Sequence, residues 1–198
     1  MLLVGLTGNY GMGKSAVLEM FARLGAFTVD ADRVVAGLLA EKAVLERLRL
    51  VLGDGAFDRE GRIIKERVSE MIFSDPALRR RVEDVLHPLV FERVDEAVRV
   101  SGAQVAVVEA PVIFERGHEG RFHRTITVYT DEETAMRRLA RSGVSREEAR
   151  RRLACQMPAG QKAARSDFAI DNSGTPEETM ARVREIYGAL RAEAARTG

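Results

Sequence analysis

The sequence has 198 residues, of which 45% are apolar and 31% are charged, and its net charge is +1. This composition is typical of a globular domain, and the balanced charge gives no overall attraction to nucleic acid or to a membrane surface. The single cysteine, Cys155, excludes an intrachain disulfide, and no zinc-type spacing of cysteine and histidine occurs. No apolar stretch approaches the roughly 20 residues of a membrane helix, and no signal peptide precedes the first strand-like run, so we expect a cytoplasmic protein.

The chain opens with an apolar run of strand length, Leu2–Thr7, followed by the segment Gly8-Asn9-Tyr10-Gly11-Met12-Gly13-Lys14-Ser15. This segment matches G-x-x-x-x-G-K-S, the phosphate-binding P-loop, and apolar residues with helical spacing follow it. Glycines let the backbone curl until its N–H groups point at a phosphate. We expect Lys14 to reach the β- and γ-phosphates of ATP and the Ser15 hydroxyl to bind Mg²⁺.

Four further strand-like runs alternate with helical patterns, namely Phe27–Val29, Gln104–Val108, Thr125–Tyr129 and Phe168–Ile170. Their nearly continuous apolar character favours a parallel sheet that is buried on both faces. The alternation predicts a P-loop NTPase-type α/β fold with a doubly wound, five-stranded parallel sheet. Ligands of such sheets bind at the carboxyl ends of the strands, so polar residues that follow a run are candidates for chemistry.

The residues between the second and third runs predict helices rather than strands. One amphipathic helical segment is expected from Val34 to Leu52. Asp75-Pro76 reads as an N-cap with proline at the first helical position, and this helix is expected to end at His87-Pro88, before a further helix. We interpret the region as a helical insertion into the α/β core.

Acids follow two of the runs. Asp30-Ala31-Asp32 follows the second run, and one of these carboxylates is suited to accept a proton from an attacking hydroxyl, although Asp32 equally suits the N-cap of the next helix. Glu109 directly follows the third run, at the Walker B position that acts on Mg²⁺ directly or through water; the alternative is a solvated loop acid.

The segment from Thr134 to Arg165 contains nine basic and two acidic residues. Arginines suit transferring phosphoryl groups because their forked donors stay charged. Near a P-loop this segment predicts a lid that closes over ATP. A nucleic-acid surface is the less favoured alternative, because the segment lacks aromatic residues for base stacking.

Taken together, these features resemble one family, dephospho-CoA kinase, from Leu3 to about Leu190. The resemblance rests on ordered motifs: Gly8–Ser15, Val29-Asp30-Ala31-Asp32, Ile72-Phe73-Ser74-Asp75-Pro76, His87-Pro88-Leu89, Val108-Glu109-Ala110-Pro111-Val112-Ile113-Phe114-Glu115 and Asp167-Phe168-Ala169-Ile170-Asp171-Asn172. It implies transfer of the ATP γ-phosphoryl group to the ribose 3′-hydroxyl of dephospho-CoA, with Mg²⁺, by a monomer or weak homo-oligomer.

The resemblance also implies roles for individual residues. Lys14, Asp32 and Arg141 would be catalytic, with Asp32 as the base or orienter of the 3′-hydroxyl and Arg141 over the phosphates. Ser15 and Glu109 would serve the metal. The nucleotide would contact Gly8, Gly11, Met12, Gly13, Lys14, Ser15, Ala16 and Asn172, and the acceptor would contact Asp32, His87 and Pro111.

The same resemblance divides the single kinase domain into three parts. Residues 1–32, 101–130 and 166–198 would form the core, about 33–100 the CoA-binding insertion and about 131–165 the lid. The family's P-loop usually reads G-G-I-G-S-G-K-S-T, and Asn9, Tyr10, Met12 and Ala16 depart from it. The alternatives are another P-loop nucleoside or nucleotide kinase and a non-metabolic nucleotide-binding switch, although no N-K-x-D guanine motif is present.

Overall fold

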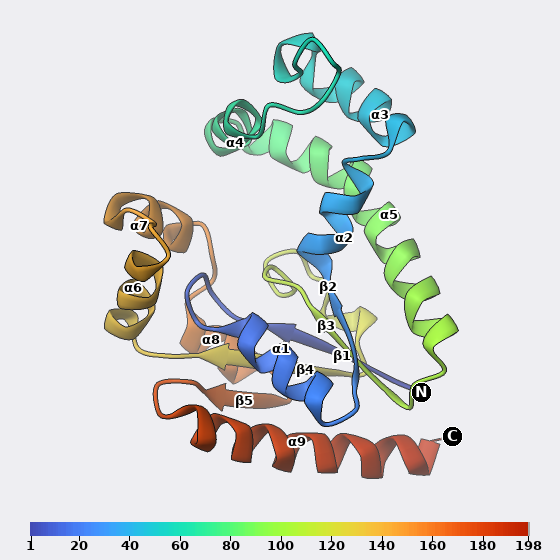
Figure 1. Ribbon diagram of the computed structural model, residues 1–198, viewed down its shortest axis with the longest axis vertical. Helices are drawn as coiled ribbons and strands as arrows, with labels where there is room; N and C mark the ends of the chain where they lie inside the picture. Colours follow the sequence, from blue (N-terminus) through green and yellow to red (C-terminus); the bar gives the residue numbers. More distant parts are fainter. Residues whose placement is uncertain (198) are drawn as a thin grey trace. The chain divides into compact units, whose positions relative to one another are not determined.

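The computed structural model describes residues 1–197 and contains one parallel β-sheet among these residues (Figure 1). Over these residues the sheet has five strands in the order β2-β3-β1-β4-β5, and all neighbouring pairs are parallel. The strands are β1 (Leu2–Thr7), β2 (Phe27–Asp30), β3 (Val105–Glu109), β4 (Arg124–Tyr129) and β5 (Phe168–Asp171). The predicted doubly wound α/β fold is confirmed, because each apolar run formed a strand.

Helices cover both faces of this sheet. On one face α1 (Lys14–Arg23) and α9 (Pro176–Thr197) pack against each other and bury Leu6 and Phe21 in the main core. The opposite face, toward which Gly5 points, is covered by the segment 110–122, which includes η2 (Glu119–Arg121), and by α8 (Ala159–Arg165). Between β4 and α8 the chain forms α6 (Glu132–Arg141) and α7 (Arg146–Ala154).

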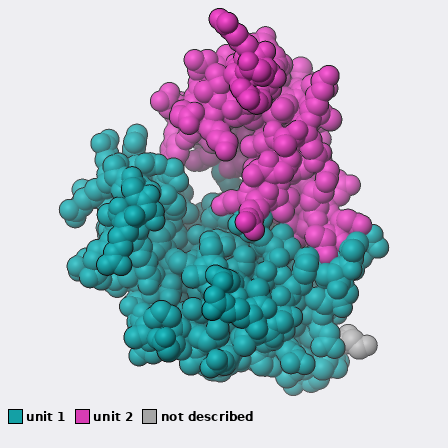
Figure 2. Space-filling model, viewed as in Figure 1, with its two compact units in different colours: residues 1–30, 98–198 teal, residues 31–97 magenta. Residues whose placement is uncertain are grey.

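The chain divides into two compact units, coloured separately in Figure 2. The first unit comprises residues 1–30 and 98–198 and contains the sheet. The second unit, residues 31–97, is helical. It contains α2 (Ala31–Leu38), α3 (Lys42–Leu52), η1 (Asp54–Ala56), α4 (Lys65–Ser74) and most of α5 (Pro76–Ser101). Its own core is formed by buried apolar residues such as Leu48, Phe57 and Val90.

Two details of the helical region differ from the prediction. The single segment expected from Val34 to Leu52 is two helices, because the chain turns between Leu38 and Lys42, just after Gly37. Apolar spacing alone does not distinguish one long helix from two short ones, and glycine weakens a helix interior.

The predicted helix break at His87-Pro88 is also wrong, since α5 continues through Pro88. An internal proline costs about 3 kcal/mol because it removes one N–H donor and crowds the preceding turn. Buried Val82 and Val90 on either side of Pro88 hold the same helix in place and offset this cost. The start of α5 is as expected, because the Asp75 carboxylate accepts hydrogen bonds from the N–H groups of Ala77 and Leu78.

The helices of residues 1–197 include none that combines the length and the apolar character needed to cross a membrane.

Candidate active site

The P-loop joins β1 to α1 in the first unit, and its backbone has the curvature that phosphate binding requires. Gly13 has a φ of 85°, and a Cβ added there would lie 2.3 Å from Nδ2 of Asn172. Any side chain at this position would therefore both strain the backbone and collide with Asn172. A Cβ at Gly8 would lie 2.3 Å from the carbonyl oxygen of Val128. Glycine is thus required at positions 8 and 13 because neighbouring atoms leave no room for a Cβ, as well as for the curved backbone of the loop.

Asn172 braces the P-loop from the end of β5. Its Nδ2 donates to the Met12 carbonyl at 2.9 Å, and its Oδ1 accepts from the Thr179 hydroxyl at 3.0 Å. Asn172 is buried, and both the amide nitrogen and the amide oxygen of its side chain form hydrogen bonds within the described residues. These bonds hold the P-loop backbone at Met12 in place. Contact with the adenine stays a prediction.

Met12 is itself held within the loop. Its N–H donates to the Asn9 carbonyl at 3.2 Å, and its Sδ lies 3.1 Å from the N–H of Thr130. Met12 thus shapes the cradle in this structure, while its predicted N–H contact with phosphate is not tested. Ala16, also expected to contact nucleotide, lies exposed in the first turn of α1.

Three predicted groups meet at the start of α1. The Ser15 hydroxyl lies 3.4 Å from Oε1 of Glu109, and Nζ of Lys14 lies 4.0 Å from the same oxygen and 3.4 Å from the Asn9 carbonyl. Glu109 is buried at the carboxyl end of β3, which pairs with β1. Since Glu109 is buried against Lys14 and Ser15, the alternative of a solvated loop acid does not describe it.

This group fits a phosphate-bound Mg²⁺. Among residues 1–197 no three His, Cys, Asp or Glu side chains converge on a possible metal position. A hydroxyl and one carboxylate are nevertheless the usual protein share for Mg²⁺, which keeps several waters and takes its other ligands from phosphates. The curled, side-chain-free glycines and the ammonium of Lys14 fit the phosphates themselves.

Arg138 in α6 lies beside the P-loop, whereas the predicted place of Arg141 over the phosphates stays a prediction. Nη2 of Arg138 donates to the Asn172 carbonyl at 2.8 Å, and its Nη1 lies 3.3 Å from the position of a Cβ on Gly13. That Nη1 is buried and has no hydrogen-bond partner within the described chain. Arg141, one turn later, is exposed at the end of α6. Basic composition alone does not distinguish the buried guanidinium of Arg138 from the exposed side chain of Arg141.

Pro111 lies beside a buried ion pair that the sequence did not reveal. Its carbonyl accepts hydrogen bonds from the Thr7 hydroxyl at 3.1 Å and from Nζ of Lys162 at 2.8 Å. Lys162 is fully buried and forms a 2.7 Å ion pair with Glu115. Burial lowers the pKa of the Lys162 ammonium, while the hydrogen bond and charge of Glu115 oppose that shift. The only sequence signal was that Lys162 is one of nine basic residues.

Replacing Lys162 with methionine should lower the free energy of unfolding by about 3–5 kcal/mol, because Glu115 would remain buried without its counter-charge. The double variant Lys162→Met/Glu115→Leu should recover much of this loss. Urea unfolding would measure both, with Arg23→Met as a control for the exposed Arg23–Glu19 pair. That control should change stability by less than about 1 kcal/mol. A single Lys162 variant as stable as the control would contradict a structural role for the buried pair.

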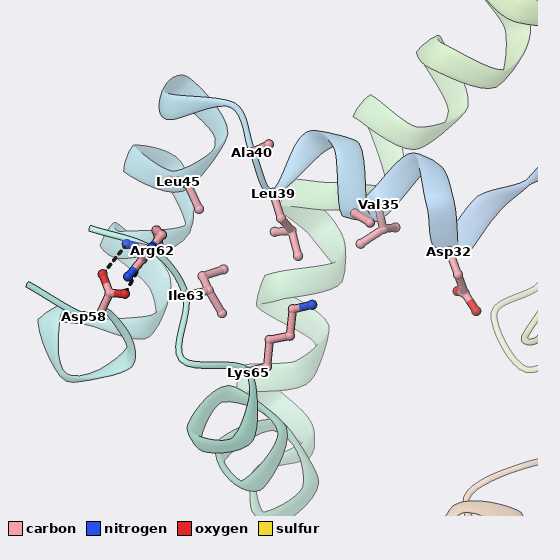
Figure 3. Close-up of a pocket in the computed structure, with 10 residues that line it drawn as sticks. Asp32, Val35, Leu39, Ala40, Leu45, Asp58, Arg62, Ile63 and Lys65 are labelled. Atoms are coloured by element: carbon pink, nitrogen blue, oxygen red, sulfur yellow. Dashed lines mark hydrogen bonds and ion pairs between the residues drawn. The ribbon is translucent and has the colours of Figure 1, made fainter. Parts of the chain in front are cut away.

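The second unit has a pocket of about 710 Å³ along one face of α2 (Figure 3). Asp32, Val35, Ala36 and Leu39 share this face, and Leu45 and Ile63 add further apolar surface. Asp32 is the second residue of α2, so it lies inside the first turn rather than at the N-cap that the sequence allowed. The Asp32 carboxylate therefore lines the mainly apolar pocket at the N-terminal end of α2.

The pocket also has charged residues. Asp58 and Arg62 form a 2.8 Å ion pair on its lining. Hydrogen bonding, first from the Arg62 backbone N–H, lowers the pKa of Asp58, so its carboxylate stays ionised at neutral pH. Lys65 lines the pocket and has no ion-pair partner within residues 1–197. His87, expected to contact the acceptor, is absent from this lining and lies in α5 with its ring 6.0 Å from that of Phe91.

Known proteins share both the sequence and this fold. A sequence profile of the dephospho-CoA kinase family matches residues 2–178. A curated dephospho-CoA kinase from Geobacter sulfurreducens is 39% identical over 198 residues, covering 94% of this chain and 98% of that protein. The crystal structure of TT1252 from Thermus thermophilus has a TM-score of 0.87 at 33% identity, covering 95% and 96% of the two chains. Dephospho-CoA kinase from Campylobacter jejuni shares the fold, with a TM-score of 0.68 at 22% identity over 96% and 98% of the chains.

Proposed function

Because the chain belongs to the dephospho-CoA kinase family, it is a kinase of the final step of coenzyme A biosynthesis, and we propose that its first unit binds ATP with Mg²⁺ while its second unit binds dephospho-CoA. The observation that carries this proposal is the group of Lys14, Ser15 and Glu109 at the start of α1. These side chains combine a cation, a hydroxyl and a carboxylate beside a glycine cradle, which is what a magnesium-bound triphosphate requires.

On the donor side, the P-loop holds the phosphates and the Lys14 ammonium neutralises the charge that grows during transfer. Ser15 and Glu109 would hold Mg²⁺, directly or through water. ATP with Mg²⁺ supplies the transferable phosphoryl group. Arg138 and Arg141, at successive turns of α6, supply further positive charge to the phosphates.

On the acceptor side, the pocket of the second unit holds dephospho-CoA. Its apolar lining suits the pantetheine arm, and the Lys65 ammonium suits the diphosphate. The Asp32 carboxylate receives the hydrogen bond of the ribose 3′-hydroxyl. His87 and Pro111 remain proposed acceptor contacts by family resemblance alone.

The reaction moves one phosphoryl group and one proton. The 3′-oxygen forms a bond to the γ-phosphorus, and the bond between that phosphorus and the β,γ-bridging oxygen breaks, so ADP leaves with the electron pair. Asp32 takes the hydroxyl proton as the new bond forms. The products are coenzyme A and ADP.

The function is tested by ADP release from ATP with four acceptors: dephospho-CoA, adenosine, AMP and pantothenate. Adenosine and AMP carry the ribose 3′-hydroxyl without the pantetheine arm, and pantothenate carries part of the arm without the ribose. We expect rapid ADP release with dephospho-CoA and slow release with the other three acceptors. Comparable rates with AMP or adenosine would instead favour a nucleotide or nucleoside kinase. The enzyme's expected form, a cytoplasmic monomer or weak homo-oligomer, stays a prediction.

The role of Arg141 leads to a separate prediction. Arg141→Ala should lower kcat by about 10²-fold if its guanidinium neutralises phosphate charge in the closed lid. Arg141→Lys should also lower kcat clearly, because it keeps the charge but loses the planar fork. Steady-state kinetics of both variants would be compared with Arg138→Lys. Normal turnover of Arg141→Ala, together with a slow Arg138→Lys, would transfer the role to Arg138.

A further inference from the structure

Asn9, the second residue of the P-loop, stands where the resembled family usually has glycine. The residue is only 5% exposed, and its Nδ2 donates to the carbonyl of Met157 at 3.0 Å. Met157 lies between α7 and α8, immediately after the arginine-rich helix α7. A glycine cannot form this bond, so the substitution adds a direct link from the phosphate loop to the segment expected to close over it.

The junction that Asn9 contacts is held from two loops. The N–H of Met157 donates to Oε1 of Glu115 at 3.0 Å, and Glu115 is fixed by its buried ion pair with Lys162. One peptide unit on each side of Met157 is therefore bonded to a loop, one following β3 and the other following β1. Because Lys162 is fully buried and only 15% of the Glu115 side chain is exposed, this junction has a support that does not depend on Asn9.

Tyr10, the next departure from the family's P-loop, contacts the same junction. Its N–H donates to Oε1 of Gln156 at 2.9 Å, and the guanidinium of Arg152 lies 4.7 Å from the centroid of its ring. Such a cation–π contact is worth about 0.5–1 kcal/mol at an exposed site. Two consecutive P-loop residues thus contact the end of α7 and the turn that follows it.

The other end of the arginine-rich segment is also packed on the P-loop. A Cβ added at Gly11 would lie 2.9 Å from the side chain of Leu139 and 3.0 Å from the Ala135 carbonyl, both in α6. With α6 packed at one end and Gln156–Met157 bonded at the other, residues 142–155 are tied to the P-loop at both ends, and Arg152 adds its contact with Tyr10.

We propose that Asn9 is a positioning residue for the kinase reaction: its carboxamide fixes the Gln156–Met157 junction on the P-loop, so that α7 returns to one place when nucleotide binds. With glycine at this position the junction would lack this bond and would have one contact fewer to order it before nucleotide binds. The bond therefore raises nucleotide affinity by ordering the segment beforehand. This proposal depends on the proposed function only for its nucleotide readout.

The first test is hydrogen exchange of the ligand-free protein, followed by mass spectrometry. Asn9→Ala should speed exchange in peptides covering residues 153–162. The backbone can accept alanine there, because Asn9, like every other described residue that is not glycine, has no positive φ. Gln156→Ala removes a second bond of the same junction and should speed exchange in the same peptides. If Asn9→Ala folds poorly, Gln156→Ala tests the junction in its place. Ser101→Ala is the matched control, because it removes the 2.7 Å hydrogen bond to the Val98 carbonyl at the opposite end of β3.

The second readout is nucleotide affinity and turnover. Losing one buried hydrogen bond should raise the ATP Kd and the KM for ATP by about threefold to tenfold, while kcat stays within about twofold. A purely structural role would lower Tm without changing the Kd of the folded protein. Exchange at residues 153–162 equal to that of Ser101→Ala, or faster exchange with an unchanged Kd, would overturn the proposal. Since exchange is measured without ATP, failure of the kinase assignment would be seen separately in the acceptor panel.

Discussion

Lys14→Ala should reduce kcat by at least about 10²–10³-fold while the protein remains folded. The Lys14 ammonium lies within the loop, 3.4 Å from the Asn9 carbonyl and 4.0 Å from Glu109, beside the glycine cradle that we propose binds the phosphates. A preorganised charge aimed at the oxygens of the transferring group stabilises the transition state more than the bound ground state. The loss should therefore appear mainly in kcat, with a smaller rise in the KM for ATP.

Lys42→Ala provides the matched control for this variant. The Lys42 side chain is 91% exposed and pairs only loosely, at 3.9 Å, with Glu46. Its removal eliminates one positive charge from the protein without touching the P-loop. Circular dichroism and urea unfolding of both variants would separate loss of chemistry from loss of fold. Turnover of Lys14→Ala within a few fold of the control would falsify the P-loop kinase mechanism.

Much of the fold could be predicted because its signals are local. A run such as Val105–Glu109 is short and apolar at nearly every position, which favours a strand buried on both faces. The exceptions arise where tertiary packing overrides local preference. Pro88 ends a helix by its own chemistry, yet α5 continues because its buried face packs on both sides of the proline. The helix-breaking effect of Pro88 is outweighed by the stabilisation from the buried residues of α5.

The residues of the candidate site could be predicted only where they belong to a short sequence motif. The residues from Gly8 to Ser15 are contiguous, and Glu109 directly follows an apolar run in the sequence, so both could be placed from sequence order. The contacts that shape the cradle join distant residues, such as Asn172 to Met12 and Asn9 to Met157, and no local pattern encodes them. Likewise, nine basic residues gave no indication that Lys162 is buried while Arg141 is exposed.

Asp32→Asn should reduce phosphoryl transfer by about 10²–10⁴-fold, the usual contribution of a general base. Asparagine has nearly the same size and fills the same place in the pocket lining, but it does not accept the proton of the ribose hydroxyl. Because Asp32 lies in the first turn of α2, the variant also loses a favourable interaction with the helix dipole, worth about 0.3–1 kcal/mol. The melting temperature should fall by only a few degrees, and ATP binding should not change.

Asp30→Asn separates this chemistry from a general effect of lost charge. Asp30 is the last residue of β2 and lies opposite Glu109 in the register with β3, two residues before Asp32 in the chain. The Asp30 variant removes the same charge from the same short segment, so a local electrostatic effect would slow both enzymes alike. We expect a much smaller loss for Asp30→Asn, measured as kcat with saturating dephospho-CoA and ATP. Equal losses would point to the charge of the segment, whereas full activity of Asp32→Asn would restrict Asp32 to stabilising α2 and leave the 3′-hydroxyl to another acceptor.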